Sequence, residues 1–157
     1  MQSKWKYLES IFKGQPDISK QLPNEDAIFR RNHAVFKEEM ERINKDRNCK
    51  RALTEKKNFL QELYALNEQF EKIQKYLRQF LESKRAQFPR FYFLSDDDLL
   101  EIIGQSKDPK PILAHIYKMF EGVFSLELVD APGANRGQKG YEITKLLAED
   151  GEQVEIK

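Results

Sequence analysis

A seven-residue repeat of apolar side chains constrains this chain more than any other feature of its sequence. The apolar residues are spaced alternately by four and three along one segment, from about Glu55 to Gln87, which places them on one face of a single long helix. At roughly 1.5 Å of rise per residue, that helix is about 50 Å long, which suits a strut better than a compact domain. The repeat consists of Phe59, Leu63, Leu66, Phe70, Ile73, Leu77 and Phe80.

The apolar stripe on this helix is wider than a two-stranded coiled coil requires. Several positions of the repeat are aromatic, and further apolar residues lie beside it. A narrow seam serves a pair of helices, whereas a broad face lets a helix pack against more than one neighbour. We therefore expect a multi-helix bundle. The residues that widen the stripe are Leu60, Tyr64, Tyr76 and Leu81.

Two shorter helical segments are predicted before the long helix. Residues 3–14 carry apolar side chains at helical spacing and end at Gly14, and a second helix begins at Pro23. The segment between them, residues 15–23, is expected to be a loop with at most one short turn. The second helix has its apolar face at Ile28, Phe29, Phe36, Met40 and Ile43.

An aromatic stretch, FPRFYF, follows the long helix. Pro89 ends that helix because the residue before a proline, Phe88, is pushed out of helical geometry, and the residues after Pro89 are expected to be extended. Aromatic side chains bury a large area at little cost in entropy, so they make a stiff joint. Arg90 is expected to stack on a ring or to cap a helix end. The residues of this structural joint are Phe88, Pro89, Arg90, Phe91, Tyr92, Phe93 and Ser95.

Three consecutive aspartates come next, and they have two interpretations. Ser95 can cap a helix with Asp98 completing a capping box, which puts carboxylates in the first turn, where they favour the helix dipole. The alternative is a divalent metal site, but the spacing of a calcium loop is missing. We favour the cap. Gly104 is expected to end this helix in a left-handed conformation.

The apolar period changes towards the end of the chain. The segment from Gln105 to Pro111 is a linker or a hinge, and a helix that begins at its prolines runs to Gly122. Beyond Gly122 apolar and polar residues alternate, which predicts strands, and Asp150-Gly151 is typical of a tight hairpin turn. The predicted fold is therefore mainly α and elongated, with a small antiparallel β-hairpin or sheet at the C-terminal end.

We expect two domains, a helical bundle over residues 1–122 and a hairpin segment over residues 123–157. The net charge is +1, from 27 Lys and Arg against 26 Asp and Glu, so the overall charge gives no support for nucleic-acid binding. No apolar run approaches the roughly 20 residues that span a bilayer. Neither nucleic acid nor a membrane is expected as a partner.

The Gly-rich segment APGANRGQKG invites comparison with a phosphate-binding loop. The Walker pattern requires four residues between its glycines and then Lys followed by Ser or Thr. Here three residues separate Gly133 from Gly137, and Gly140 follows Lys139. A flexible connection between strands is the better interpretation. We predict no catalytic residue, cofactor-binding residue or metal ligand in this chain.

Several stretches, in order along the chain, point to a family. They are WKYLESIF, DISKQLPNE, LNEQFEKIQKYL, FPRFYFLSDDDLLEIIGQSKDP, HIYKMFEGV and ITKLLAEDGEQVEI. Together they resemble the linker region of dynein heavy chains, with the block from Leu81 to Leu100 the most specific. The resemblance favours axonemal over cytoplasmic forms. It covers nearly the whole chain, which it implies to be a fragment of a much larger motor chain.

The resemblance implies a mechanical function. Dynein linkers are rod-like, arch over the AAA+ ring of the same heavy chain, and bend and straighten in the ATP-driven power stroke. ATP and magnesium bind elsewhere in the parent chain, which works on microtubules with other dynein chains, so this fragment is implied to be non-catalytic and without a cofactor. The implied location is the cytoplasm and cytoskeleton, in the axoneme of a cilium or flagellum. The implied ring-contact hairpin, residues 141–156, has as candidates Tyr141, Ile143, Lys145, Asp150, Gly151 and Val154.

A static scaffold or adaptor that binds partner helices is the alternative function. It predicts that the chain associates through the seam between Phe59 and Phe80, whereas a linker predicts that the seam is already buried within the chain.

Overall fold

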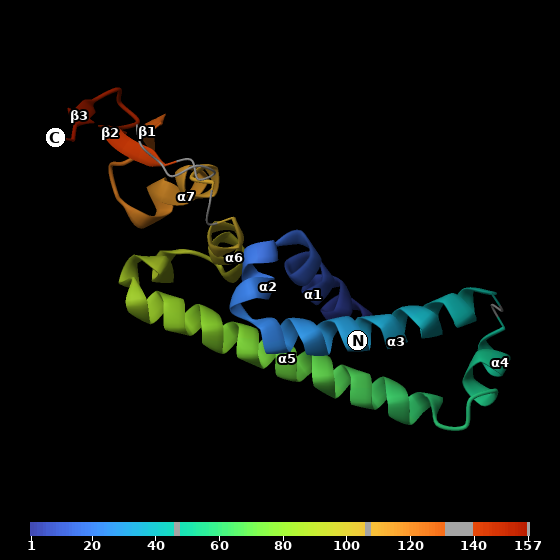
Figure 1. Cartoon of the computed structure of the whole chain (residues 1–157). Helices are drawn as coiled ribbons and strands as arrows, with labels where there is room; N and C mark the ends of the chain where they lie inside the picture. The colour runs from blue at the N-terminus through green and yellow to red at the C-terminus, as the bar shows by residue number, and fades with distance from the viewer. Residues whose placement is uncertain (46–47, 106–107, 131–139, 157) are drawn as a thin grey trace. The chain divides into compact units, whose positions relative to one another are not determined.

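The computed structural model describes residues 1–45, 48–105, 108–130 and 140–156. It divides into two compact units, Met1–Phe80 and Leu81–Lys157. The predicted fold class is confirmed, because helices make up most of the chain and a small antiparallel sheet closes it (Figure 1). The elements are α1 (Gln2–Gly14), α2 (Pro16–Gln21), α3 (Pro23–Lys45), α4 (Cys49–Thr54), α5 (Phe59–Gln87), the 3-10 helix η1 (Pro89–Phe93), α6 (Asp96–Gly104), α7 (Lys110–Met119), β1 (Ser125–Asp130), β2 (Tyr141–Leu147) and β3 (Gln153–Glu155).

Some of the features predicted from the sequence lie outside the described residues. These are the residues of the phosphate-loop comparison, Gly133, Gly137 and Lys139, and two residues of the hinge or linker, Ser106 and Lys107. Among the described residues, no helix combines the length and the apolar character that crossing a membrane requires.

The first unit is built on α3 and α5, which run side by side (Figure 1). The α5 seam supplies its core: Phe70 and Ile73 are almost fully buried, and Phe70 meets Phe36 of α3 edge-on at a centroid distance of 6.3 Å. Helix α1 covers the same core, where the rings of Phe12 and Phe29 stack at 5.3 Å. The seam predicted from the repeat is confirmed. The buried cluster comprises Leu8, Phe12, Phe29, Phe36, Leu66, Phe70 and Ile73.

The predicted widening of that seam is wrong at three positions. Leu60, Tyr64 and Tyr76 are 61%, 65% and 53% exposed. A helix buries only the face that its neighbours cover, and apolar residues on the flank of that face stay in water. The repeat itself was therefore the better guide to the core than the residues beside it.

A histidine joins α1 to α3 in this unit. Trp5 Nε1 donates a 2.9 Å hydrogen bond to His33 Nδ1, and the two rings stack at 5.6 Å. Lys13 Nζ lies 2.9 Å from the other ring nitrogen of His33. Burial lowers the pKa of His33, and the charge of Lys13 lowers it further. Both nitrogens thus face groups that disfavour protonation of the ring.

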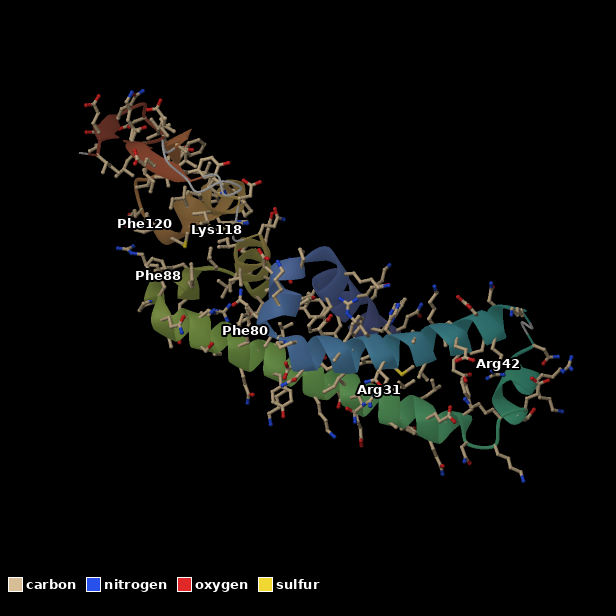
Figure 2. All side chains as sticks on the ribbon, viewed as in Figure 1. Arg31, Arg42, Phe80, Phe88, Lys118 and Phe120 are labelled. Atoms are coloured by element: carbon tan, nitrogen blue, oxygen red, sulfur yellow. The ribbon has the colours of Figure 1, made fainter. Side chains whose placement is uncertain are left out.

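A buried carboxylate joins the C-terminal part of α3 to the turn that precedes α5. Glu39 is only 7% exposed and accepts hydrogen bonds from Lys56 Nζ and, at 3.0 Å, from Arg42 Nε. Burial raises the pKa of Glu39, but the hydrogen bonds from Lys56 and Arg42 outweigh it, so the net pKa is lowered. Arg42, labelled in Figure 2, also lies 5.2 Å over the ring of Phe59.

Two helix boundaries differ from the prediction. Residues Pro16–Gln21 form a short helix in place of the expected loop, because Pro16 is preset for the first helical turn and Ile18 becomes fully buried. The long helix begins at Phe59, four positions after the expected start at Glu55. There Lys56 forms ion pairs with both Glu39 and Glu62, and these pairs hold it in the turn that precedes α5.

The second unit ends in a three-stranded antiparallel sheet in the order β1-β2-β3. Ser125 pairs with Leu147 at one end of the β1–β2 ladder and Asp130 with Tyr141 at the other. The register shifts between Glu127 and Leu128, which pair with Lys145 and Ile143, so the bulge places one extra residue, Thr144, in β2. Helix α7 lies beside η1, α6 and β1, so it links the aromatic stretch to the sheet.

Gly104 does not end α6 in the left-handed conformation that the sequence suggested. The helix runs through Gly104, and its cap residue Gln105 has φ of -124°. Among the described glycines only Gly122 and Gly151 have positive φ, at 81° and 93°. These two glycines make the turns that lead into β1 and into β3.

Candidate functional site

The aromatic stretch after α5 turns the chain without burying most of its rings. Phe88 is extended before Pro89, as predicted, and α5 ends there. The next residues form the 3-10 helix η1, so the prediction of an extended segment is wrong; proline presets the φ of a first helical residue. Tyr92 and Phe93 are 59% and 67% exposed, and only Phe91 is half-buried, where it meets Phe88 edge-on at 4.8 Å.

A buried arginine crosses this turn. Arg85 is 8% exposed, and its Nη2 donates to Asp96 Oδ1 at 2.7 Å and to the Leu94 carbonyl at 3.2 Å. The hydrogen bond to Asp96 raises the pKa of Arg85. The guanidinium therefore ties the last turns of α5 to the first turn of α6. Arg85 was not among the predicted residues, because nothing in its sequence spacing from Asp96 indicates their contact.

Arg90 holds the other side of the joint, in both ways that the sequence suggested. Its guanidinium lies 4.4 Å over the ring of Phe120, and its Nη1 donates a 2.8 Å hydrogen bond to the Met119 carbonyl. Met119 is the last residue of α7, whose final carbonyls lack partners within the helix. Arg90 thus caps α7 and covers a ring beside it. Figure 2 labels Phe88 and Phe120 at this place in the second unit.

The three aspartates act at the start of α6. Ser95 and Asp98 form the predicted capping box, each side chain bonded to the other residue's backbone N–H. Lys118 Nζ donates a 2.9 Å hydrogen bond to Asp98 Oδ2, and this bond lowers the pKa of Asp98 to about 2. His115 lies beside the same carboxylate, with Nδ1 3.5 Å from Oδ1. Asp98 therefore has a structural role: it caps α6 and contacts Lys118 and His115 of α7.

The hairpin presents apolar side chains to the surface. Tyr141, Ile143 and Val154 are 38%, 46% and 51% exposed. Lys145 pairs with Glu127 across the strands at 3.3 Å. A small sheet is stable when its apolar face is covered. Several exposed apolar residues on one sheet therefore favour a surface that binds another protein.

The turn of the hairpin is formed as the sequence predicted. Asp150 Oδ1 accepts a 3.1 Å hydrogen bond from the Glu152 N–H, and Gly151 supplies the positive φ of 93°. Ala148 N–H donates a 2.9 Å hydrogen bond to the Glu152 carbonyl, and this bond closes the turn. The candidate contacts Asp150 and Gly151 therefore lie at a defined, exposed tip.

The polar contacts of the second unit join its elements to one another. In the stretches that the structure describes, no group of three or more His, Cys, Asp or Glu side chains is placed to hold a metal ion. The strongest polar contacts of the second unit, those of Arg85, Arg90 and Lys118, each hold one element against another. Exposed apolar side chains of η1 and of the sheet lie at the surface of the same unit.

Comparison with known proteins gives one family over the whole chain. Residues 1–157 match the family described as "Dynein heavy chain, N-terminal region 2". The chain is 46% identical over 138 residues to "Dynein-1-beta heavy chain, flagellar inner arm I1 complex" of Chlamydomonas reinhardtii, which covers 88% of this chain and 3% of that protein. It is 43% identical over 156 residues to "Dynein axonemal heavy chain 2" of Mus musculus, covering 99% of this chain and 3% of that protein. The chain thus spans a small fraction of the length of the curated relatives it matches.

Proposed function

The chain belongs to the dynein heavy chain family, and from that premise we propose that it is a mechanical linker element of a dynein microtubule motor. In this proposal it bends and straightens over the AAA+ ring of the same heavy chain and so transmits the ATP-driven power stroke. The fragment itself is non-catalytic, and ATP and magnesium bind elsewhere in the motor, which acts on microtubules with other dynein chains.

One observation supports a lever most directly, namely the covered seam of α5. Phe59, Leu66 and Phe70 are between 0% and 7% exposed, in a helix that continues without a break to Gln87. A lever has to resist bending, and a helix packed along its length against neighbours is stiffer than a lone one. The ion pairs that hold Glu39 and the ring stack at His33 add fixed contacts along the same unit.

The alternative, a static scaffold, finds less support. It requires that the seam between Phe59 and Phe80 be free for partner helices, yet α1 and α3 already cover it. On α5 the exposed apolar residues Leu60, Tyr64 and Tyr76 lie outside this seam and are left for such a role.

We propose the hairpin as the surface that meets the ring. Its exposed apolar residues and its defined turn support this assignment, since a lever needs a contact that forms and breaks with the nucleotide state. The relatives are described as axonemal and flagellar heavy chains, so we place the parent motor in the cytoskeleton of a cilium or flagellum.

The test is made in the intact motor, with microtubule gliding speed and ATPase rate measured on the same preparation. The hairpin variant carries Ile143→Thr and Val154→Thr, which keep β-branching but remove exposed apolar surface. The matched control carries Leu60→Gln and Tyr64→Gln on the exposed flank of α5. The proposal expects the hairpin variant to lose speed while ATPase is retained, and the control to keep both.

Other outcomes separate the alternatives. If the hairpin variant loses both speed and ATPase, the hairpin supports the ring itself. If it changes neither, the hairpin is not the contact. If only the control loses speed, the exposed flank of α5, and not the hairpin, carries the interaction.

A further inference from the structure

A hollow of about 430 Å³ opens in the second unit where α7, β1 and the β2–β3 turn come together. Aromatic and aliphatic side chains form its walls, and two carboxylates stand among them. The lining residues are Tyr117, Phe120, Val123, Phe124, Glu121 and Glu149. None of these belongs to the joint or to the hairpin candidates named from the sequence.

Backbone hydrogen bonds fix the walls of this hollow. After α7 the chain turns through Gly122, and Val123 N–H donates to the Phe120 carbonyl at 3.2 Å. Phe124 N–H donates to the Leu147 carbonyl at 2.8 Å, which fastens the start of β1 to the end of β2. The backbone that carries these side chains is therefore held in place before any partner binds, and binding need not bear the cost of ordering it.

The chemistry of the walls suits a cation. The faces of aromatic rings attract positive charge, and carboxylates accept strong hydrogen bonds from guanidinium and ammonium groups. Within the described residues neither Glu121 nor Glu149 forms an ion pair. The nearest candidates are already engaged: Arg90 lies over Phe120 and bonds the Met119 carbonyl, and Lys118 bonds Asp98.

The charge around the hollow points the same way. Residues 121–157 contain eight Asp and Glu against four Lys and Arg, a net charge of -4, in a chain whose total is +1. Of those four bases, the structure describes only Lys145, and it is paired with Glu127. An acidic surface attracts a basic partner and repels an acidic one. This attraction favours both the rate at which a basic partner associates and its specificity.

We propose that this hollow receives a cationic side chain, arginine in preference to lysine, from the ring surface that the hairpin meets. The proposal rests on the function proposed above and specifies the chemistry of its partner. Arginine is favoured because its flat guanidinium stacks on rings and offers several donors at once, whereas lysine presents a compact point charge. The guanidinium would lie against Phe124 and donate to Glu121 and Glu149.

The experiment places the photo-crosslinking residue p-benzoylphenylalanine at position 124 of the intact motor and identifies the cross-linked peptide by mass spectrometry. A second preparation adds Glu121→Gln and Glu149→Gln, which keep the shape of the walls and remove their charge. The matched control adds Glu68→Gln and Asp97→Asn, an equal change of net charge at exposed positions outside the hollow and the hairpin.

We expect a cross-link to a peptide that contains arginine or lysine next to the point of attachment. Its yield should fall about ten-fold or more in the double glutamine variant, which corresponds to about 1.4 kcal/mol of lost affinity, and should change little in the control. The yield should also decrease as salt is raised, because exposed ion pairs are screened.

The outcomes distinguish this proposal from the proposed function. A cross-link to the ring at a peptide without a basic residue, or one insensitive to the glutamine pair, would overturn the cationic assignment and leave the ring contact standing. A charge-dependent cross-link to a basic peptide outside the ring would uphold the chemistry of the hollow and count against the hairpin as the ring contact. Absence of any cross-link in every nucleotide state would overturn the proposal.

Discussion

Arg85 and Asp96 lie eleven positions apart in the sequence, yet Arg85 Nη2 is 2.7 Å from Asp96 Oδ1. Their contact closes the turn formed by η1 and keeps a buried guanidinium paired. Because the same Nη2 also bonds the Leu94 carbonyl at 3.2 Å, the arginine holds backbone as well as side chain.

Replacement of this arginine should therefore destabilise the second unit. Arg85→Ala is expected to cost about 2 kcal/mol, the usual effect of leaving a buried acceptor without its charged donor. Hydrogen exchange of the α6 amides, with chemical denaturation of the chain, measures the loss. Arg78→Ala is the control, because Arg78 is exposed on the same helix, and it should change stability by less than about 0.5 kcal/mol. Equal effects of the two substitutions would contradict the role given to Arg85.

The Asp98–Lys118 contact predicts how stability changes in acid. The pKa of Asp98 is lowered from 3.8 to about 2, chiefly by the hydrogen bond from Lys118. A carboxyl with a depressed pKa contributes stability that is complete above its unfolded value and is lost as pH falls from 3.8 through about 2. Asp98→Asn should weaken this part of the acid dependence. Unfolding curves between pH 5 and pH 2, compared with those of Asp97→Asn at a neighbouring exposed position, measure it.

His33 predicts a second pH effect, nearer neutrality. Burial and Lys13 lower its pKa below 6.5, so the unfolded chain takes up the proton before the folded one does. The folded state should therefore lose stability as pH falls below 6.5 towards the lowered pKa. Trp5 is the only tryptophan in the chain and donates to His33, so its fluorescence reports the change.

The control for this effect is His33→Gln, whose amide oxygen can still accept from the indole but does not titrate in this range. The variant should show a flat Trp5 signal across the same pH interval. A wild-type signal that is equally flat would mean that His33 does not gain a proton there.

An exposed ring of the aromatic stretch and a buried ring of the α5 seam should differ sharply in their contribution to stability. Phe93 is 67% exposed, so Phe93→Ala should cost less than about 0.5 kcal/mol. Phe70, in the core of the first unit, is fully buried, and Phe70→Ala should cost about 3–5 kcal/mol. Denaturation of both variants tests the contrast. A large cost at Phe93 would show that the stretch is packed in solution.

Two glycines form a matched pair for a test of backbone conformation. A Cβ atom at Gly14 or at Gly151 would meet nothing within 4 Å, but Gly151 has φ of 93° and Gly14 has no positive φ. Gly151→Ala should therefore destabilise the hairpin by about 1 kcal/mol, while Gly14→Ala should be neutral or stabilising by up to about 1 kcal/mol. Amide exchange in β2 and in α1 measures the two effects separately.

Local signals in the sequence predicted local structure well. The capping box of Ser95 and Asp98, the end of α5 before Pro89 and the turn at Asp150-Gly151 each depend on a few neighbouring residues. The α5 seam was found because its repeat extends over three heptads. The dynein resemblance is confirmed by the match over residues 1–157.

Contacts that depend on the tertiary fold were not predictable in the same way. Arg85 reaches Asp96, and Lys118 reaches Asp98, only because the chain folds back at η1 and again before α7. The exposure of Phe93 also depends on the tertiary fold, since the sequence alone does not show which aromatic side chains other elements will bury. The hollow at Glu121 and Glu149 is lined by residues that are distant in the sequence, so neither an apolar repeat nor a motif predicts it.

The bulge between Glu127 and Leu128 determines which length changes this part of the chain tolerates. Because β2 has one extra residue, Thr144, between the partners of Glu127 and Leu128, loss of a single residue from β2 there would restore a regular ladder and exchange the faces of every β2 residue on one side of it. Insertions and deletions in β2 would thus reverse which of its side chains the sheet exposes to a neighbour. Within the dynein family, the residue count of this strand should accordingly vary less than its composition, a pattern that an alignment of many heavy chains would expose.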